Sequence, residues 1–210
     1  MKNQLPQKDK ESKLRDLWMD FKRGDTNAFG IIYSEHIDFL FNYGRSVTRN
    51  VEIIEDSIHD LFLYVFSKKD EIITPDYIQY YLLKAYKRIL IEKIRAERKI
   101  ETKIDDGAIG FDLEIETEGI AEKEIEEKKI TLIESLIEKL DPKKKEVIFL
   151  KFQSGLSYVE IAEIVGIQPS SVKQIVYRVI SSFHEIVKDH AIELLFLFFK
   201  KCKVWIFFVL

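Results

Sequence analysis

The sequence has few of the residues that crosslink or bend a chain. Cysteine occurs once, at Cys202, so no internal disulfide can form. Only 8 glycines and 4 prolines are spread over 210 residues, which favours long helices over many turns. No segment alternates apolar and polar residues convincingly, as a half-buried strand would. Apolar residues recur instead at helical spacing, and we expect an all-α chain.

Sequence patterns of enzyme chemistry are also lacking. No glycine-rich phosphate loop and no nucleophile with an obvious base occur, and His184, Glu185 and His190 lack the spacing of the zinc-protease motif. We therefore predict a protein that is not an enzyme and that needs no cofactor or metal. The start of the sequence has no signal-peptide pattern, which together with the single cysteine predicts a cytoplasmic chain.

A strong positive charge is absent as well. The formal net charge is −3, although charged residues make up 33% of the chain. A protein that coats nucleic acid without sequence preference would be basic. Any contact with DNA must therefore come from local basic patches.

The stretch from Leu156 to Phe183 has the pattern of two short helices joined by a tight turn. Ser157 and Glu160 have the spacing of a capping box. Gly166 suits the turn, because glycine adopts a left-handed backbone at the least cost, and Pro169 suits the first position of the next helix. The apolar stripes of the two helices are Ile161, Ala162 and Val165, then Val172, Ile175, Val176, Val179, Ile180 and Phe183.

The outer face of the second of these helices has side chains that can contact phosphates and base edges. They are Ser170, Ser171, Lys173, Gln174, Tyr177 and Arg178. This arrangement predicts a DNA-binding helix-turn-helix whose second helix is the reader. An ordinary helical hairpin is the alternative, but cap, small residue, glycine, proline and both stripes together favour DNA binding.

Three helices are expected in the first third of the chain. The first, over 11–23, has Leu14, Leu17, Trp18 and Phe21 on one face. Gly24 ends it and Asp25 caps the second, whose apolar face is Phe29, Ile32, Tyr33, Ile37, Leu40 and Phe41. The third follows Asn50, with Ile54, Ile58, Leu61, Phe62 and Val65 facing inward and Asp56, His59, Asp60 and Tyr64 on another face.

A fourth helix is expected to begin at the Thr74-Pro75 cap and to run from Asp76 to about Lys99. Its tyrosines Tyr77, Tyr80, Tyr81 and Tyr86 are interleaved with Lys84, Lys87, Arg88, Lys93, Arg95, Arg98 and Lys99. Aromatic rings that stack on unpaired bases, beside cations that follow phosphates, are typical of single-stranded nucleic-acid binding. An amphipathic helix with half-buried tyrosines and solvated lysines is the alternative at this point.

The composition then divides the chain. An acidic stretch punctuated by glycines predicts a flexible linker over 101–127 between domains at 11–100 and 128–190, followed by a tail at 191–210. In the second domain Asp141-Pro142 is expected to start a helix in which Val147, Ile148, Leu150 and Lys151 alternate burial with exposure. Phe152 closes the core face of that helix.

Four phrases in this order resemble an extracytoplasmic-function (ECF) sigma factor of the sigma-70 family, Bacteroidetes-like. Gly24, Asp25, Ala28 and Phe29 match G-D-x-x-A-F, and the stretch Gly155–Ala162 matches G-[LM]-S-[YH]-x-E-I-A. Glu55, Asp56, His59, Asp60 and Phe62 match E-D-x-x-Q-[DE]-x-F with histidine in place of glutamine. Tyr81, Leu82, Lys87 and Arg88 match Y-L-x-x-x-x-R-N with arginine in place of asparagine.

The resemblance implies a non-catalytic subunit of transcription initiation with two helical domains, region 2 and region 4. Region 2 would bind the beta-prime clamp of RNA polymerase core through Asp56, His59, Asp60, Leu63 and Tyr64. It would melt the minus-10 promoter element with Tyr77, Tyr80, Tyr81, Lys84, Lys87 and Arg88, and with a pocket in the 68–73 loop. Region 4 would read the minus-35 element.

Two other functions are weighed against this one. A plain helix-turn-helix regulator would not need the Glu55–Phe62 phrase followed by a tyrosine- and lysine-rich helix. A polymerase-binding adaptor that has lost promoter reading, or that depends on a recruiting protein, fits a reader helix with two cations. An anti-sigma factor is a further possible partner.

The last twenty residues are intensely apolar in two runs, Ile192–Phe199 and Val204–Leu210, separated by Lys200, Lys201, Cys202 and Lys203. Each run is shorter than the roughly 20 residues that span a bilayer. A single span would place lysines near its middle, at about 2.5–3.5 kcal/mol each. Three fates stay open: packing on the chain's own domains, docking on a partner, or lying on a membrane surface, the last being the least favoured.

Overall fold

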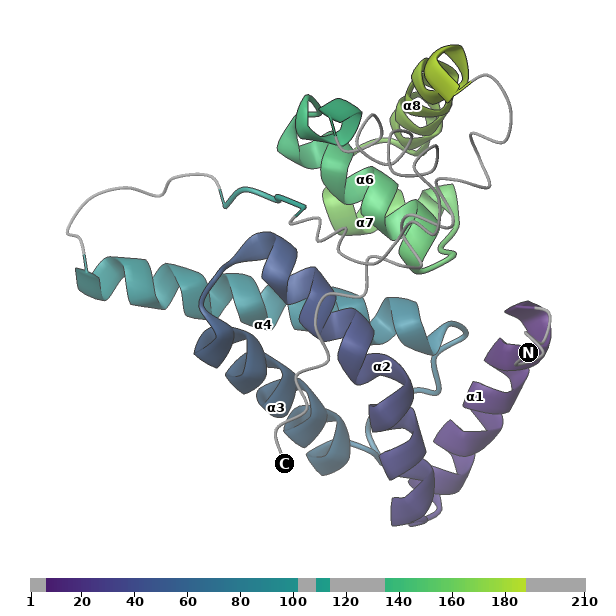
Figure 1. Cartoon of the computed structure of the whole chain (residues 1–210). Coiled ribbons are helices and arrows are strands. Elements are labelled where there is room, and N and C mark those ends of the chain that lie inside the picture. The colour runs from purple at the N-terminus through teal and green to yellow at the C-terminus, as the bar shows by residue number, and fades with distance from the viewer. Residues whose placement is uncertain (1–6, 102–108, 114–134, 188–210) are drawn as a thin grey trace, which may run out of the picture. The chain divides into compact units, whose positions relative to one another are not determined.

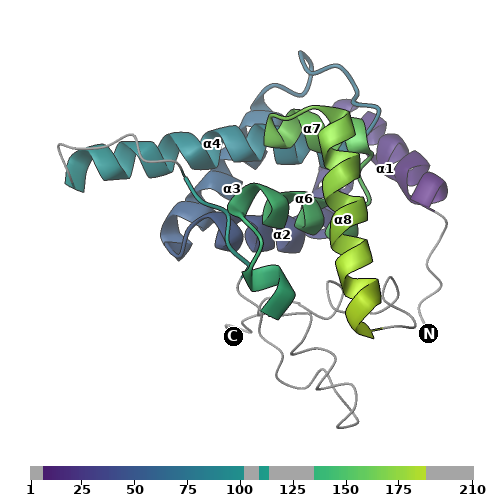
Figure 2. The ribbon, with the colours of Figure 1, turned by 90° about the horizontal axis from the view of Figure 1, so that it is seen from above.

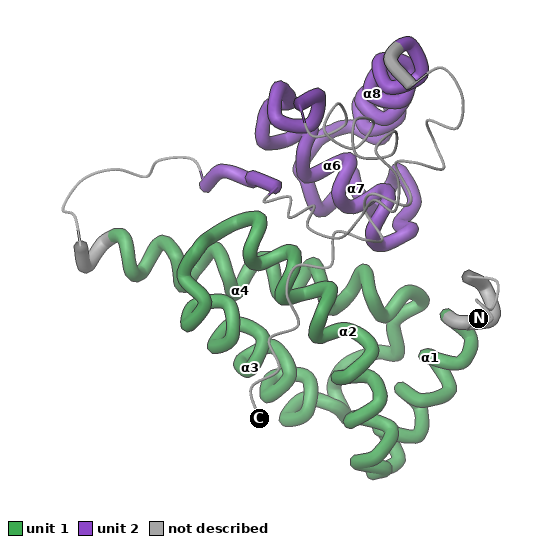
Figure 3. Tube along the Cα trace, in the orientation of Figure 1, with its two compact units in different colours: residues 1–107 green, residues 108–210 purple. Residues whose placement is uncertain are grey.

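The computed structural model describes residues 7–101, 109–113 and 135–187 of the chain. The chain divides into two compact units, residues 1–107 and 108–210 (Figure 3). The described residues form helices and no strand, which confirms the predicted all-α fold class for that part of the chain. The tail at 191–210 lies outside the described residues.

The described residues of unit 1 form four helices in chain order (Figure 1). Their bounds are α1 Gln7–Lys22, α2 Thr26–Val47, α3 Val51–Ser67 and α4 Ile78–Glu101. Each helix packs on the next, with α3 against α4, and α4 also contacts α1 and α2. The two long helices α2 and α4 therefore contact each other and also both α1 and α3, and the four helices share one core.

The breaks between the first helices lie where the sequence predicts them. Gly24 has φ 105°, a left-handed conformation that glycine adopts without strain. The Asp25 carboxylate accepts hydrogen bonds from the backbone N–H groups of Asn27 and Ala28 and so caps α2. Asn50 caps α3 in the same way through the N–H of Ile53.

The core of unit 1 confirms the inward face predicted for α3 and corrects that of α2. All five predicted α3 residues are buried. In α2 the buried stripe follows Ala28, Ile32, His36 and Leu40, spaced by four residues. Tyr33 is about 100° away from Ile32 around the helix. The tyrosine is 37% exposed and rests at the rim, with its ring centroid 4.7 Å from that of Phe62.

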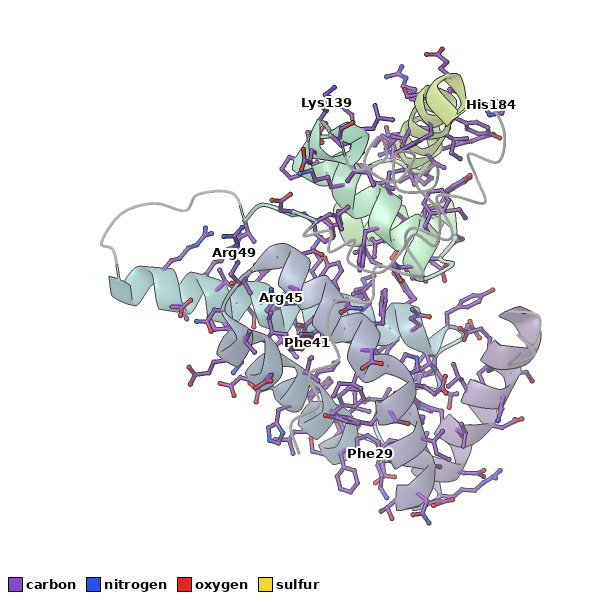
Figure 4. The ribbon with its side chains drawn as sticks, in the orientation of Figure 1. Phe29, Phe41, Arg45, Arg49, Lys139 and His184 are labelled. Carbon is purple, nitrogen blue, oxygen red and sulfur yellow. The ribbon has the colours of Figure 1, made fainter. Side chains whose placement is uncertain are left out.

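An aromatic cluster closes the end of unit 1 near the N-terminus of α2. Phe29 packs against Phe21, Phe62 and Phe66, with ring centroids 4.7 to 5.9 Å apart. Figure 4 shows Phe29 near one end of α2 and Arg45 and Arg49 at the other. The cluster leaves Phe66 44% exposed, so the unit presents apolar surface at this end.

The prediction that α4 starts at Thr74-Pro75 is wrong, because the helix begins at Ile78. The preceding residues are held against α1 instead. The Lys22 ammonium donates to the Ile72 carbonyl, the Thr74 hydroxyl to the Met19 sulfur at 3.2 Å, and Arg15 pairs with Asp76 at 3.1 Å. These long-range contacts hold residues 72–76 against α1, and the first helical turn follows them.

Two contacts fix the position of α4 in unit 1. Trp18 of α1 is fully buried, and its ring stands edge-on to that of Tyr81, with centroids 5.8 Å apart. Gly44 of α2 lies so close to α4 that a Cβ there would overlap the Tyr86 hydroxyl oxygen and lie 2.9 Å from Ile54 Cγ2. Only glycine permits this approach of the two helices without displacement of a neighbour.

Unit 2 contains a short helical stretch at 135–138 and three longer helices that pack on one another (Figure 2). Their bounds are α6 Pro142–Gln153, α7 Tyr158–Val165 and α8 Pro169–Val187. The Asp141 cap and the proline at the start of α6 are confirmed. None of the described helices is both long enough and apolar enough to cross a membrane.

The predicted alternation along α6 is wrong, because Val147, Ile148, Phe149 and Leu150 are all buried. Both α7 and α8 pack on α6, and Phe111 covers a further side with its ring centroid 5.6 Å from that of Phe149. Asp112 pairs with Lys145 beside it at 2.5 Å. Residues 109–113, which fall inside the predicted linker, are thus packed on unit 2.

Candidate functional site

The helix-turn-helix of unit 2 is built by the residues that the sequence singles out. Ser157 Oγ accepts from the N–H of Glu160 at 3.3 Å, and the Glu160 carboxylate accepts from the N–H of Ser157 at 2.7 Å. This reciprocal pair is the predicted capping box. Gly166 ends α7 in the left-handed conformation, with φ 74° and ψ 45°. The predicted turn between α7 and α8 is therefore confirmed.

The inner faces of α7 and α8 hold the motif on α6. Ile161, Ala162 and Val165 of α7 are buried, as are Val172, Val176, Val179 and Phe183 of α8. Ile175 and Ile180 are half-buried at the edges of the stripe. With one side of α8 fixed in this way, its opposite side is directed to solvent.

The predicted reader residues lie on that solvent side. Ser170, Lys173, Gln174, Tyr177 and Arg178 are exposed, and Ser171 is half-buried. The Lys173 ammonium lies 5.8 Å from the centroid of the Tyr177 ring, and Tyr177 is 58% exposed. Two cations, an amide and a phenol on adjacent turns can contact phosphates and base edges of duplex DNA.

Beside the reader face, α8 borders a cavity of about 380 Å³. Ser171, Gln174 and Arg178 line it from α8, and the segment from Leu136 to Lys144 lines it from the other side. Lys139, labelled in Figure 4, and Lys144 belong to that segment. Sequence reasoning missed both cations as neighbours of the reader helix, because their closeness to Arg178 depends on how α6 packs on α8.

The candidate strand-binding residues on α4 and directly before it differ in accessibility. Tyr77 is 53% exposed, whereas Tyr80 and Tyr81 are half-buried. Lys84 donates to the Tyr80 hydroxyl at 2.8 Å and lies 5.2 Å from the centroid of the same ring. Lys87 is half-buried, and the exposed Arg88 lies 3.9 Å from Glu92.

The tyrosines of this stretch lie partly at the surface and partly in the core. Tyr86 is fully buried, so this ring is no candidate for base stacking. Burial also raises the pKa of Tyr81 above the usual value for a phenol. Its hydroxyl therefore stays protonated, and able to donate a hydrogen bond, over the physiological range.

The candidate polymerase-binding residues share one face of α3. Asp56, His59, Asp60, Leu63 and Tyr64 are all exposed. Leu63 is 53% exposed, so the face combines two carboxylates with apolar surface. Such a mixture of charge and exposed apolar area is typical of a surface that docks on another protein.

Lys93 of α4 belongs to this α3 face and not to the strand-binding face. Its ammonium lies 2.8 Å from a carboxylate oxygen of Asp60 and 4.0 Å from one of Asp56. The sequence pattern groups Lys93 with the cations of its own helix, because the pairing with α3 depends on the α3–α4 packing. The lysine holds the two carboxylates at a common site.

A segment of unit 2 matches a known family. Residues 130–181 match the sequence model described as Sigma-70, region 4. The matched range contains α6, α7 and most of α8, and it confirms the predicted resemblance to the sigma-70 family. The Bacteroidetes-like character of that resemblance stays a prediction. No curated protein matches the chain in sequence.

Solved structures with a similar backbone include two complexes. CnrH in complex with the cytosolic domain of CnrY is 16% identical, with a TM-score of 0.49, and the match covers 83% of this chain and 96% of that one. The sigma factor RpoE in complex with the anti-sigma factor NepR from Bartonella quintana is 19% identical, with a TM-score of 0.47. That match covers 81% of this chain and 98% of the other.

Proposed function

We propose that this chain, whose residues 130–181 match sigma-70 region 4, is an ECF-type sigma factor. It binds RNA polymerase core in the cytoplasm and directs promoter recognition and melting without catalysing a reaction itself. The observation that carries the proposal is that the family match falls on a capped helix-turn-helix with a solvent-directed reader face. The domain bounds are those expected from the sequence, with region 2 at 11–100 and region 4 at 128–190.

Unit 2 would read the minus-35 element as duplex DNA. Lys173, Gln174, Tyr177 and Arg178 project from α8 at positions from which a helix in the major groove reaches base edges and phosphates. Ser170 and Ser171 lie nearest the N-terminal end of α8. Backbone phosphates are favoured there, because the N-terminal end of a helix carries a partial positive charge.

Unit 1 would hold the melted minus-10 strand along α4. Tyr77, the most exposed of the three candidate tyrosines, offers a free ring face on which an unpaired base can stack. Tyr80 and Tyr81 are half-buried, while Lys84, Lys87 and Arg88 supply cations one and two turns further along. Ile73, which is 87% exposed, places an apolar side chain before the same end of α4.

The α3 face would dock on the beta-prime clamp of polymerase core. Asp56 and Asp60 provide negative charge for a basic partner surface, and Leu63 and Tyr64 provide apolar area beside it. Lys93 keeps the carboxylates ordered before binding, which lowers the entropy lost on docking. His59 lies between the two carboxylates in sequence and completes the face.

A polymerase-binding adaptor that depends on a separate recruiting protein is the second candidate function. It is favoured by the two cations of the reader face, Lys173 and Arg178, in a chain of net charge −3. Affinity for DNA rises with each phosphate that the protein neutralises. A chain that makes so few contacts with DNA would depend on a recruiting protein to select its promoters. An anti-sigma factor could keep the chain from RNA polymerase.

Core binding is tested by reversing one charge of the α3 face. Asp60→Lys is expected to weaken binding to purified sigma-free core at least tenfold, or about 1.4 kcal/mol, because it opposes a basic partner surface. The measurement is a fluorescence-anisotropy titration. Asp38→Lys, an equal charge change at an exposed site on α2, is the matched control and should bind as the parent does.

A second variant separates docking from folding. Combining Asp60→Lys with Lys93→Asp restores an ion pair of reversed polarity between α3 and α4. Thermal stability should recover while core binding stays weak. If the double variant recovered core affinity as well, or if Asp38→Lys weakened binding as much as Asp60→Lys, the assigned docking face would be wrong.

A further inference from the structure

The cavity beside α8 has an apolar floor that nothing in unit 2 covers among the described residues. Val179 and Phe183 of α8 line it and are themselves 6% and 1% exposed. Leu136, Leu140 and Ile175 stand along its sides and are only half-buried. The groove therefore presents apolar surface in a strip that follows the length of α8.

We propose that the apolar run Ile192–Phe199 of this chain docks in the groove and covers part of the reader helix. The run follows α8 directly, because the described part of that helix ends at Val187. Residues 188–191 would form the connection, and helical hairpins are commonly joined by about 2–5 residues. So short a connection gives the run a high effective concentration at the groove.

The lengths of the run and of the groove agree. The stretch from Ile175 to Phe183 that lines the groove rises about 12 Å along α8, at 1.5 Å per residue. A helix over Ile192–Phe199 is one residue shorter than that stretch and rises about 10.5 Å. If this helix returned antiparallel to α8, it would cover the strip from Phe183 toward Ile175. Its own apolar side chains would then be buried and not exposed to water.

Charge favours this run over the one that follows it. The groove is lined by Lys139, Lys144 and Arg178 and by no carboxylate. The run Ile192–Phe199 has one charged residue, Glu193, and the three lysines of the tail come after it. In the antiparallel arrangement these lysines emerge beyond the groove, at its Ser171 end, where they avoid the cations of its lining.

Docking has a consequence for DNA binding. Ser171, Gln174 and Arg178, which line the groove, are also reader residues. A helix seated there removes them from the DNA while Lys173 and Tyr177 stay accessible. The tail thus weakens binding of DNA by the isolated chain, and a partner that takes up the tail would release the reader helix. This consequence rests on the proposed function, whereas docking itself does not.

The native Cys202 makes docking measurable, because it is the only cysteine of the chain. Ser171→Cys in the full chain places a second thiol at the groove end that Cys202 is expected to reach. Ser170→Cys is the matched control, since Ser170 is adjacent in sequence but does not line the groove. In a glutathione redox buffer the Ser171→Cys variant should form the intramolecular disulfide at least tenfold more readily, and equal disulfide formation in the two variants would overturn docking.

The consequence is measured with substitutions confined to the tail. The full chain with Leu195→Glu and Phe198→Glu should bind a labelled mixed-sequence DNA duplex about tenfold more tightly than the parent. Two added carboxylates by themselves would weaken DNA binding. The matched control is Val204→Glu with Phe207→Glu, which adds the same charge to the second run and should give no gain.

The outcomes distinguish docking of the tail in the groove from inhibition of DNA binding by the docked tail. A disulfide without any gain in duplex binding would overturn the inhibition and leave docking supported. A gain shared by the control variant would overturn the assignment of Ile192–Phe199 as the docked run. Absence of duplex binding in every variant, at low salt, would overturn the inhibition together with the DNA-reading role of α8, while the disulfide still decides docking.

Discussion

Replacing Trp18 with alanine should lower the free energy of unfolding of unit 1 by about 3–5 kcal/mol, the usual cost of truncating a buried large aromatic residue. Trp18 is fully buried, and its ring is edge-on to both Phe21 and Tyr81. The alanine variant leaves a cavity between α1 and α4 that neighbouring side chains fill only in part. Loss of this contact also frees Tyr81, a candidate strand-binding residue.

Hydrogen exchange of α4 peptides measures this loss in unit 1, with α8 peptides as the internal reference in unit 2. Trp18→Phe is the informative control, because it keeps an aromatic ring and removes an indole N–H that has no hydrogen-bond partner in the structure. We expect it to cost less than about 1.5 kcal/mol. Equal losses for the two variants would show that the size of the side chain at 18 is not what holds α4.

Gly44→Ala should destabilise unit 1 by about 2–3 kcal/mol, in the upper part of the range for overpacking a core. The new methyl group overlaps the Tyr86 hydroxyl oxygen and approaches Ile54, so α2 and α4 must move apart. Gly30→Ala in the same helix is the matched control, since a Cβ there meets nothing within 4 Å. That substitution should stabilise by about 0.5–1 kcal/mol through helix propensity.

A double variant identifies the atom responsible. The Tyr86 hydroxyl is buried and has no hydrogen-bond partner, so Tyr86→Phe removes both the overlap with that hydroxyl and an unsatisfied polar group, while the contact with Ile54 stays. Gly44→Ala with Tyr86→Phe should recover about 1 kcal/mol beyond the effect of Tyr86→Phe alone, the size expected for residues in contact. Chemical denaturation followed by circular dichroism gives the four free energies, and additivity would contradict the proposed contact.

The features of unit 1 and unit 2 that were predictable from the sequence are local ones. Asp25, Asn50, Asp141 and Ser157 cap the helices that they precede, and each does so with a side-chain oxygen a few bonds from the backbone it satisfies. The left-handed Gly166 and the exposed face of α8 follow from residues within one turn of each other. Such interactions require no knowledge of the rest of the fold.

The features that sequence reasoning missed depend on contacts between distant segments. Tyr86 and Tyr80 belong to the same tyrosine- and lysine-rich pattern in the sequence. Only Tyr86 is buried in the core, where it packs against Gly44 of α2. Lys93 pairs with Asp60 across the α3–α4 interface. Asp76, which precedes α4, pairs with Arg15 of α1. Phe111, which falls within the predicted acidic linker, packs against Phe149 of α6. Periodicity alone specifies none of these partners.

The same distinction applies to the candidate sites. The α3 face and all the predicted reader residues of α8 except the half-buried Ser171 are exposed, because a single amphipathic helix determines which side each residue takes. The groove lined by Leu136, Leu140 and Arg178 exists only once two segments have packed together. The sequence identifies the tail as unusual, but the proposal that it docks in the groove required the structure.

Transcription by sigma-free RNA polymerase core tests the central claim most directly. The purified full chain is added to core with a library of promoter-containing DNA, and the 5′ ends of the transcripts are mapped. We expect transcripts that start at defined positions, depend on the chain, and disappear with Asp60→Lys but persist with Asp38→Lys. Core binding without any chain-dependent start sites, in the presence of the intact α8 reader face, would contradict it.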